Sequence, residues 1–514
     1  MTDVHQPGQP TAMPGSPMLQ ATGDGVPFWA RQSGILIIVG VWAAVHAFIA
    51  VFMEGAINLD DATESYLSQS LEAAYVGRNP PLFNWLLYGL QKIVGTGPLG
   101  FALLRYVPLF LCAFLVYRIA RQLIVDPRLQ ALAVYSLSAI WVIGFHSHRI
   151  LTHSNLMIVA IAGVFLTLLV LVRRPSLGLY AALGLWSILG LMSQFGFAAF
   201  LAVLTLACLL EPTFRRALLD RRIVITLIIA TLPMLAYGVA LNHSGNAPPQ
   251  VMADLLSGSG AGPDRVLASY VAALFGYALP LVALVAFIFL PWNRGDRALA
   301  EPQEERAAAR RVLRWFIVIG VLALLISSLV AGTDSVRDRN LHVFLLLLPV
   351  YLFAELERLG GWHPRVNYYL GALGALALIV VVVRVLVQLW PHPALCGRCL
   401  PAEPLYKISA PILMGLGPAP TLVADDRASA GRLRAAVPGA RVVIAAEFEY
   451  HPPARQATGC ARVTGIANGL PVLLPAPHRD TMEMSIKWPA PLMKPPRLSD
   501  WQVTPLPKDD PLCR

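Results

Sequence analysis

The sequence predicts a mainly α-helical membrane protein: a polytopic bundle of about eleven transmembrane helices with a small C-terminal extracytoplasmic α/β domain. Of its 514 residues, 56% are hydrophobic and only 14% are charged. The apolar residues are concentrated in runs long enough to cross a bilayer, and the composition becomes polar and proline-rich from Pro391 onward. So much apolar surface does not fit into one soluble core, so lipid must act as its solvent.

The apolar runs are the first set of predicted elements. A helix needs about 20 apolar residues to span the hydrocarbon layer, and runs of about that length, nearly free of acidic and basic residues, cover 33–53, 98–117, 129–145, 154–172, 177–193, 195–210, 223–241, 266–291, 315–332, 342–354 and 367–390. The division between the fifth and sixth runs is weakest, because only Ser193 and Gln194 interrupt them.

Loop charges predict the orientation. With a cytoplasmic N-terminus, the short cytoplasmic loops hold seventeen arginines, whereas the opposite loops before the tail hold six Lys and Arg residues. Basic residues stay on the cytoplasmic side, so we expect a multi-pass membrane protein whose odd number of spans places the C-terminus outside the cytoplasm. The net charge of +10 then indicates topology and attraction to membrane lipid, and we expect no nucleic-acid partner.

Three regions are predicted. Residues 1–32 form a disordered cytoplasmic tail, residues 33–390 form the transmembrane domain with a first outer loop at 54–97, and residues 391–514 form the α/β domain. Within this last region, residues 421–444 are expected to form strand, helix and strand, with Leu433 facing inward.

Four of the six cysteines lie in the C-terminal region: Cys396, Cys399, Cys460 and Cys513. An oxidising compartment allows them to form disulfides with three alternative connectivities. The alternative is a zinc site at Cys396 and Cys399, but no second clustered pair accompanies it.

The first outer loop opens with two adjacent carboxylates, Asp60 and Asp61. The residues that follow, up to Tyr75, can form an amphipathic helix on the bilayer, and a second interfacial helix is expected after Pro81. A loop this apolar should pack over the mouths of the spans and fix the acidic pair there. A carboxylate so placed can act as a general base, help to hold a divalent cation, or neutralise an internal arginine.

Two further polar segments are candidates for binding. The segment 146–156 contains Arg149, His153 and Ser154, and a polar headgroup-level loop is the alternative to a ligand site. The segment 333–349 contains Arg337, Arg339 and His342. Paired guanidiniums on the outer side can hold a lipid phosphate and stabilise its departure, or they can contact headgroups or pair with Asp334 or Asp338. Lys92 is a weaker candidate of the same kind.

Several of these segments resemble a known family. DDATESYLSQSL and NPPLFNWL (60–71 and 79–86), LTHSNL (151–156), LGLMSQFGFAAFL (189–201) and RDRNLHVFLLLLPVYLF (337–353) are similar to motifs of the bacterial protein O-mannosyltransferase-like enzymes, which include the lipid A aminoarabinose transferases. The resemblance spans about 33–390. It implies a GT-C glycosyltransferase fold with an outer active site and a polyprenyl-phosphate sugar donor.

The resemblance also implies residue roles. The essential acid of the family falls on Asp60, and its neighbouring glutamate falls on Asp61. Many members carry an aspartate where this chain has Ser154 and a lysine where it has Gln194. These departures weaken the expectation of a two-carboxylate metal site, so we predict no required cofactor and leave a divalent cation as an open alternative.

The predicted function is transfer of a sugar from a polyprenyl-phosphate donor to an envelope glycolipid, a lipid A core or a polysaccharide. Asp60 acts as the general base with inversion, Asp61 orients it or binds a sugar hydroxyl, and Arg337, Arg339, Lys92, Arg149, His153, Ser154 and His342 bind substrate. The alternatives are a lipid or solute transporter and a catalytically lapsed relative that acts as an assembly partner.

Overall fold

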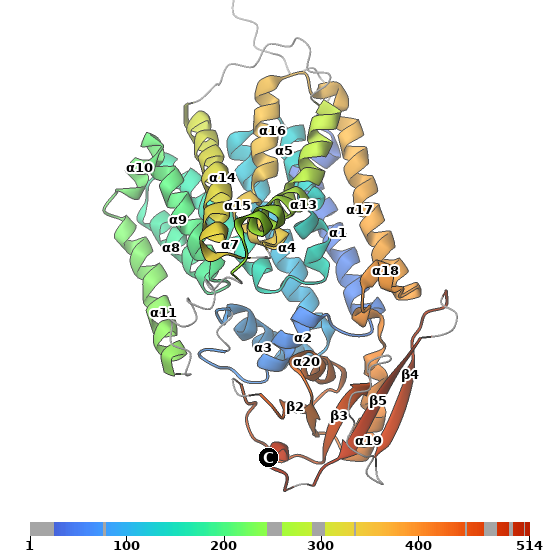
Figure 1. The fold of residues 1–514 in the computed structure, drawn as a ribbon. Helices are drawn as coiled ribbons and strands as arrows, with labels where there is room; N and C mark the ends of the chain where they lie inside the picture. The colour runs from blue at the N-terminus through green and yellow to red at the C-terminus, as the bar shows by residue number, and fades with distance from the viewer. Residues whose placement is uncertain are drawn as a thin grey trace, which may run out of the picture.

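The structure is a computed structural model that describes residues 25–75, 79–243, 260–289, 304–333, 336–447, 450–466, 481–492, 497–507 and 509–514. A helical bundle occupies most of it, and a small mixed sheet lies at one end (Figure 1). The bundle helices are α1 (Gln32–Phe48, continued by a π-helical turn over Ile49–Met53), α4 (Pro98–Leu123), α5 (Pro127–Tyr135), α6 (Trp141–Gly144), α7 (His153–Arg173), α8 (Leu177–Leu191), α9 (Gly196–Leu209), α10 (Pro212–Leu218), α11 (Ile223–His243), α13 (Pro263–Phe289), α14 (Glu304–Ala331), α15 (Asp338–Leu345), α16 (Leu348–Leu359) and α17 (Val366–Leu389).

All eleven predicted apolar runs are helical, wholly or in large part. Within the described residues, seven helices are long and apolar enough to cross a membrane, and two bent pairs raise the number to nine. The bent pairs join Pro127–Ala139 to Trp141–His148 at 73° and Asp338–Leu345 to Leu348–Leu359 at 52°. The other two runs are the shorter apolar helices α8 and α9. The predicted fold class is therefore confirmed.

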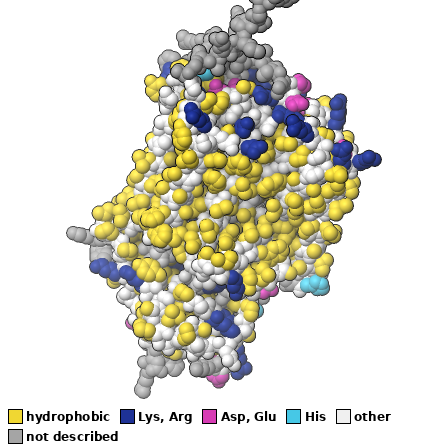
Figure 2. Space-filling model, turned by 180° about the vertical axis from the view of Figure 1, so that it is seen from behind, with side chains coloured by type: hydrophobic (Ala, Val, Ile, Leu, Met, Phe, Trp, Pro, Cys, Tyr) yellow, Lys and Arg dark blue, Asp and Glu magenta, His cyan; other side chains and the backbone are white. Residues whose placement is uncertain are grey.

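The outer surface of the bundle is apolar, as a lipid-facing surface must be. Figure 2 shows a broad hydrophobic belt around the middle of the molecule, with the Lys and Arg side chains of this face mostly towards its two ends. Large side chains such as Phe287 and Val330 are more than four-fifths exposed. Exposed apolar surface of this extent marks a multi-pass membrane protein rather than a soluble one.

The predicted N-terminal tail is partly wrong. Residues 1–24 lie outside the described residues, but Phe28–Ala30 form a 3-10 turn and Ala30 is buried. The Tyr135 hydroxyl donates a hydrogen bond to the Trp29 carbonyl at 2.7 Å. The aromatic pair Phe28 and Trp29 ends the polar tail earlier than Ser33, because Trp29 packs against the bundle core.

The C-terminal sheet has the strand order β2-β1-β3-β5-β4. Its strands are β1 (Thr421–Ala424), β2 (Arg441–Ile444), β3 (Cys460–Ile466), β4 (Met482–Lys487) and β5 (Leu498–Pro505), and the nearby helices are α18 (Pro393–Cys396), α19 (Ser409–Leu416) and α20 (Arg427–Ala436). Strand β1 is parallel to β2 and β3, and the other pairings are antiparallel. The strand, helix and strand expected at 421–444 are present, and Leu433 is fully buried.

Disulfides link Cys396 to Cys399 and Cys460 to Cys513. This is one of the three connectivities that the sequence allowed, and it excludes the zinc alternative at Cys396 and Cys399, because disulfide sulfurs are not thiolate ligands.

The first outer loop contains α2 (Leu59–Leu67) and α3 (Leu82–Val94). The helix predicted to run on towards Tyr75 ends at Leu67. Its apolar face does not lie on lipid, because Tyr66 and Tyr75 pack in a buried cluster with Leu433 and Val442 of the C-terminal region. Periodicity reveals an apolar face but does not show whether lipid or protein covers it.

Candidate active site

Helix α2 carries the acidic pair in its first turn, where the positive end of the helix dipole favours carboxylates. Ala62 and Tyr66 lie four residues apart on the same face and are both fully buried. This buried face fixes the rotation of the helix, so Asp60 and Asp61 face different surroundings.

Asp60 is half-buried, and its side chain makes no hydrogen bond or ion pair with any residue that the structure describes. Burial and the nearby charge of Glu64 raise the pKa of the Asp60 carboxyl above its ordinary value, against the attraction of Arg339 and, more weakly, of Arg105 and Arg337. The carboxylate is thus unpaired among the described residues, partly desolvated and within the field of three guanidiniums. A carboxylate in this state is a stronger base than one in water.

Asp61 is almost completely buried and has a different partner. Its two oxygens accept hydrogen bonds of 2.8 and 2.7 Å from Nη2 of Arg105, which projects from α4. Burial raises the pKa of Asp61 to about 6 in spite of that guanidinium. Asp61 therefore neutralises an internal arginine, which is the third role that the sequence left open for this acidic pair.

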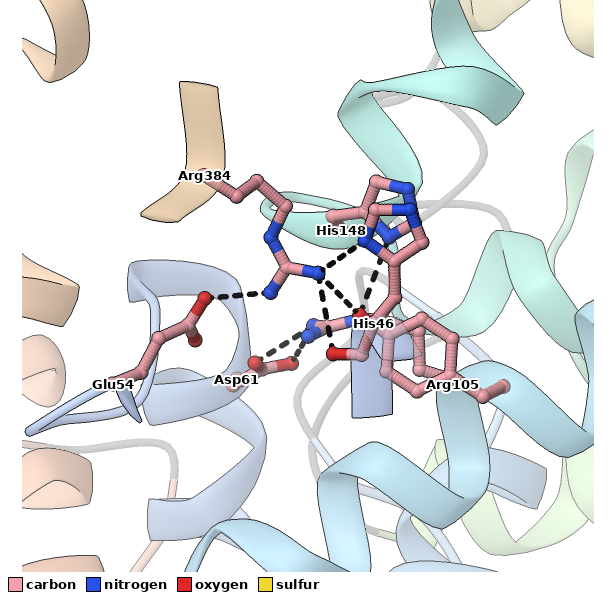
Figure 3. Close-up of polar contacts among 7 residues, drawn as sticks. His46, Glu54, Asp61, Arg105, His148 and Arg384 are labelled. Carbon is pink, nitrogen blue, oxygen red and sulfur yellow. Dashed lines mark hydrogen bonds and ion pairs between the residues drawn. The ribbon is translucent and has the colours of Figure 1, made fainter. Parts of the chain in front are cut away.

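A second buried ion pair lies beside the first one (Figure 3). Nη2 of Arg384 on α17 lies 2.7 Å from Oε1 of Glu54. Nη1 of Arg384 also lies 2.9 Å from Nδ1 of His46 and 3.1 Å from the Tyr106 hydroxyl. Arg105 and Arg384 therefore each have a buried carboxylate partner, as a low-dielectric site requires.

The three histidines of the segment 146–156 contact three different partners. His146 Nδ1 lies 3.3 Å from Asp338, His148 stacks on His46 with ring centroids 4.0 Å apart, and His153 Nε2 lies 3.1 Å from Glu64. No group of three or more His, Cys, Asp or Glu side chains within the described ranges could hold a metal ion.

Glu64 links His153 to the first outer loop, because its second oxygen accepts a 2.6 Å hydrogen bond from Asn84. Ser154, the next residue, donates to Gln194 at 3.0 Å. Two positions at which this chain departs from the family pattern therefore contact each other as a neutral pair.

Arg337 and Arg339 lie at the beginning of α15. Arg337 is exposed and Arg339 is half-buried. In the part of the chain that the structure describes, neither guanidinium donates a hydrogen bond or forms an ion pair. Asp334, one of the two partners considered for them, lies outside the described residues, and the carboxylate of Asp338 is paired with His146.

The remaining predicted residues lie in other environments. Lys92 is exposed at the end of α3 and stacks over Tyr88, with 4.9 Å from Nζ to the ring centroid. Arg149 is half-buried and donates to the Cys396 carbonyl at 3.4 Å. His342 is buried against Tyr277, and within the described residues neither of its ring nitrogens has a hydrogen-bond partner.

The sequence prediction missed Arg105, Arg384, Glu54 and His46. A signal for them existed, because Arg105, Arg384 and His46 each lie inside a predicted apolar run. An ionisable residue within a membrane span marks a candidate functional site.

This chain is similar to known proteins in sequence and in structure. The family model described as dolichyl-phosphate-mannose-protein mannosyltransferase matches residues 78–237. The lipopolysaccharide core galacturonosyltransferase RgtA of Rhizobium johnstonii is 27% identical over 433 residues, which cover 80% of this chain and 82% of that protein. RgtB of the same organism, also named a lipopolysaccharide core galacturonosyltransferase, is 24% identical over 434 residues, 82% of this chain and 84% of the relative.

The fold is similar to that of a solved structure. The crystal structure of ArnT from Cupriavidus metallidurans bound to undecaprenyl phosphate superposes with a TM-score of 0.57. The match covers 85% of this chain and 94% of ArnT, at 14% sequence identity. The fold is thus shared over nearly the whole of both chains, and the sequence relatives are named glycosyltransferases. The chain is a membrane glycosyltransferase with a GT-C fold like that of ArnT.

Proposed function

We propose that this enzyme transfers a hexuronic acid from a polyprenyl-phosphate donor to a sugar hydroxyl of the lipopolysaccharide core, with Asp60 as the general base. One observation carries the proposal: Asp60 is a half-buried carboxylate without a partner among the described residues, and the charges of Arg339 and Arg337 act on it. A base and two phosphate-binding cations are the groups that such a transfer needs.

The reaction is a single displacement. The Asp60 carboxylate accepts the proton of the acceptor hydroxyl while the acceptor oxygen attacks the anomeric carbon. The bond from that carbon to the phosphate oxygen breaks, and polyprenyl phosphate leaves with the electron pair, so the anomeric configuration inverts. The leaving phosphate needs charge stabilisation more than protonation, and unpaired guanidiniums supply it.

Asp61 has a supporting part in this proposal. Its carboxylate is occupied by Arg105, so it is not available to accept the proton of an acceptor. The pair instead anchors the first turn of α2 to α4 and so fixes the position of Asp60. Arg149, Lys92, His153, Ser154 and His342 stay as predicted substrate contacts, of which His153 is tied to α2 through Glu64.

The substrate class is taken from the named relatives. RgtA and RgtB are galacturonosyltransferases of the lipopolysaccharide core, and ArnT was crystallised with undecaprenyl phosphate. We place the reaction on the periplasmic face of the inner membrane, since the loop arginines predict that the end carrying α2 and the C-terminal sheet faces away from the cytoplasm. Because the sequence relatives are named glycosyltransferases, we do not propose the transporter alternative.

Mass spectrometry of envelope glycolipids tests the proposal. A strain that lacks this protein should produce a lipopolysaccharide core shorter by a hexuronic acid, and wild-type protein should restore that residue. Asp60→Asn should not restore it, although the variant accumulates in the membrane. Unchanged glycolipids in the deletion strain would refute the assigned substrates, and full restoration by Asp60→Asn would refute the role of Asp60.

A further inference from the structure

The C-terminal domain contacts the catalytic helix directly. Helix α20 of that domain lies against α2, as Figure 1 shows, and the two helices meet at Gly431 and Ala62. A Cβ atom on Gly431 would lie 1.6 Å from the Ala62 carbonyl oxygen, which is backbone and does not rotate away. Only glycine permits this approach, so the residue at position 431 sets the distance between the two helices.

Arg434, one helical turn further along α20, binds the other end of α2. Its guanidinium donates hydrogen bonds to the carbonyls of Ser65 and Ser68, the latter at 2.9 Å. The Arg434 side chain is buried, and its described hydrogen-bond partners are these two carbonyls rather than a carboxylate. These carbonyls are the negative end of the helix dipole, so a buried cation stabilises the helix there while Asp60 and Asp61 occupy its positive end.

Two further contacts join α2 and the loop that follows it to the C-terminal domain. The amide of Gln69 pairs with the backbone of Val442 in both directions, at 2.8 Å each, as a neighbouring strand would. The Tyr66 hydroxyl donates to the Tyr450 carbonyl at 3.0 Å. The helix that carries Asp60 is therefore held by α4 on one side and by the C-terminal domain on another.

We infer that the C-terminal domain is a positioning element for the transfer reaction: Gly431 and Arg434 set the depth and the axial position of α2, and so bring Asp60 to the reacting atoms. This inference rests on the proposed role of Asp60. Gly431 and Arg434 should then affect the rate of the chemical step and not donor binding, because the proposed donor contacts, Arg337 and Arg339, lie on neither α2 nor α20.

The test uses the full-length purified enzyme and three variants. Gly431→Ala pushes α20 and α2 apart by about an ångström or more, and a misplacement of that size reduces turnover by about 100-fold. Gly415→Ala in α19 is the matched control, because a Cβ atom there meets nothing within 4 Å. Arg434→Met removes the hydrogen bonds to α2, and Arg434→Lys keeps the charge.

Turnover per folded molecule separates positioning from mere stability. For Gly431→Ala and Arg434→Met we expect a large fall in kcat, unchanged affinity for undecaprenyl phosphate in detergent micelles, and partial rescue of kcat by Arg434→Lys. Gly415→Ala should retain wild-type kcat. Wild-type kcat in folded Gly431→Ala and Arg434→Met, or loss of undecaprenyl phosphate binding together with kcat, would overturn the inference.

Asp60→Asn separates this inference from the proposed function. If Asp60→Asn is inactive and both positioning variants turn over normally, only the inference fails. If Asp60→Asn is as active as wild type, the proposed function fails instead.

Discussion

Breaking the buried ion pair between Asp61 and Arg105 should destabilise the enzyme strongly. Both side chains are only 4% exposed, and two hydrogen bonds of 2.8 and 2.7 Å join them. Removing one partner leaves the other charge buried and uncompensated, which costs about 3 to 5 kcal/mol. We therefore expect Arg105→Met to lower the melting temperature by about 5 °C or more.

The enzyme contains its own reporters for this measurement. Cys112 and Cys208 are free and buried, whereas the other four cysteines form disulfides. A maleimide dye that fluoresces on reaction with a thiol will therefore report unfolding of the bundle as the temperature rises.

The exposed pair of Arg358 and Glu355 is the matched control, since the side chain of Arg358 is 46% exposed. Arg358→Met should cost no more than about 0.5 kcal/mol. The double variant Asp61→Asn with Arg105→Met should recover much of the loss, because no uncompensated charge remains. If Arg105→Met melts no earlier than Arg358→Met, the account of this pair is refuted.

Two other predictions follow from the site and the disulfides. The acid limb of the pH profile of kcat/KM should lie above the ordinary pKa of an aspartate, because a base with a raised pKa loses activity as the pH falls through that value. Arg339→Gln removes a charge that lowers the pKa of Asp60, so this variant should move the acid limb to higher pH. The control variant Arg149→Gln should leave the acid limb in place. The disulfide from Cys460 to Cys513 closes a loop with a sequence separation of 53, so its removal should destabilise the C-terminal domain by about 4 kcal/mol. Cys460→Ser should therefore be more sensitive to limited proteolysis than the wild-type protein. Equal sensitivity of the two proteins would contradict this prediction.

The transmembrane elements could be predicted because their signal is local. Lipid requires a continuous apolar surface and internally satisfied backbone, so composition alone located every run that became a helix. The bends between α5 and α6 and between α15 and α16 were not predicted, because they depend on packing between distant segments.

The candidate site could be predicted only in part. Asp60 was found from its place after an apolar run and from the family motif, but Arg105 and Arg384 were not. Their partners lie 44 and 330 residues away along the chain, and no sequence pattern shows which carboxylate neutralises which arginine. Asp61 is buried against Arg105 and Asp60 is half-buried because of the rotation of α2, which is set by the packing of Ala62 and Tyr66. The sequence pattern does not reveal this rotation.

Single-turnover transfer by purified Asp60→Asn tests the central claim most directly. The variant should bind undecaprenyl phosphate as tightly as wild type, because the guanidiniums of Arg337 and Arg339 are intact, yet transfer hexuronic acid from the polyprenyl-phosphate donor at least about 100-fold more slowly. Transfer at the wild-type rate would contradict the assignment of Asp60 as the general base.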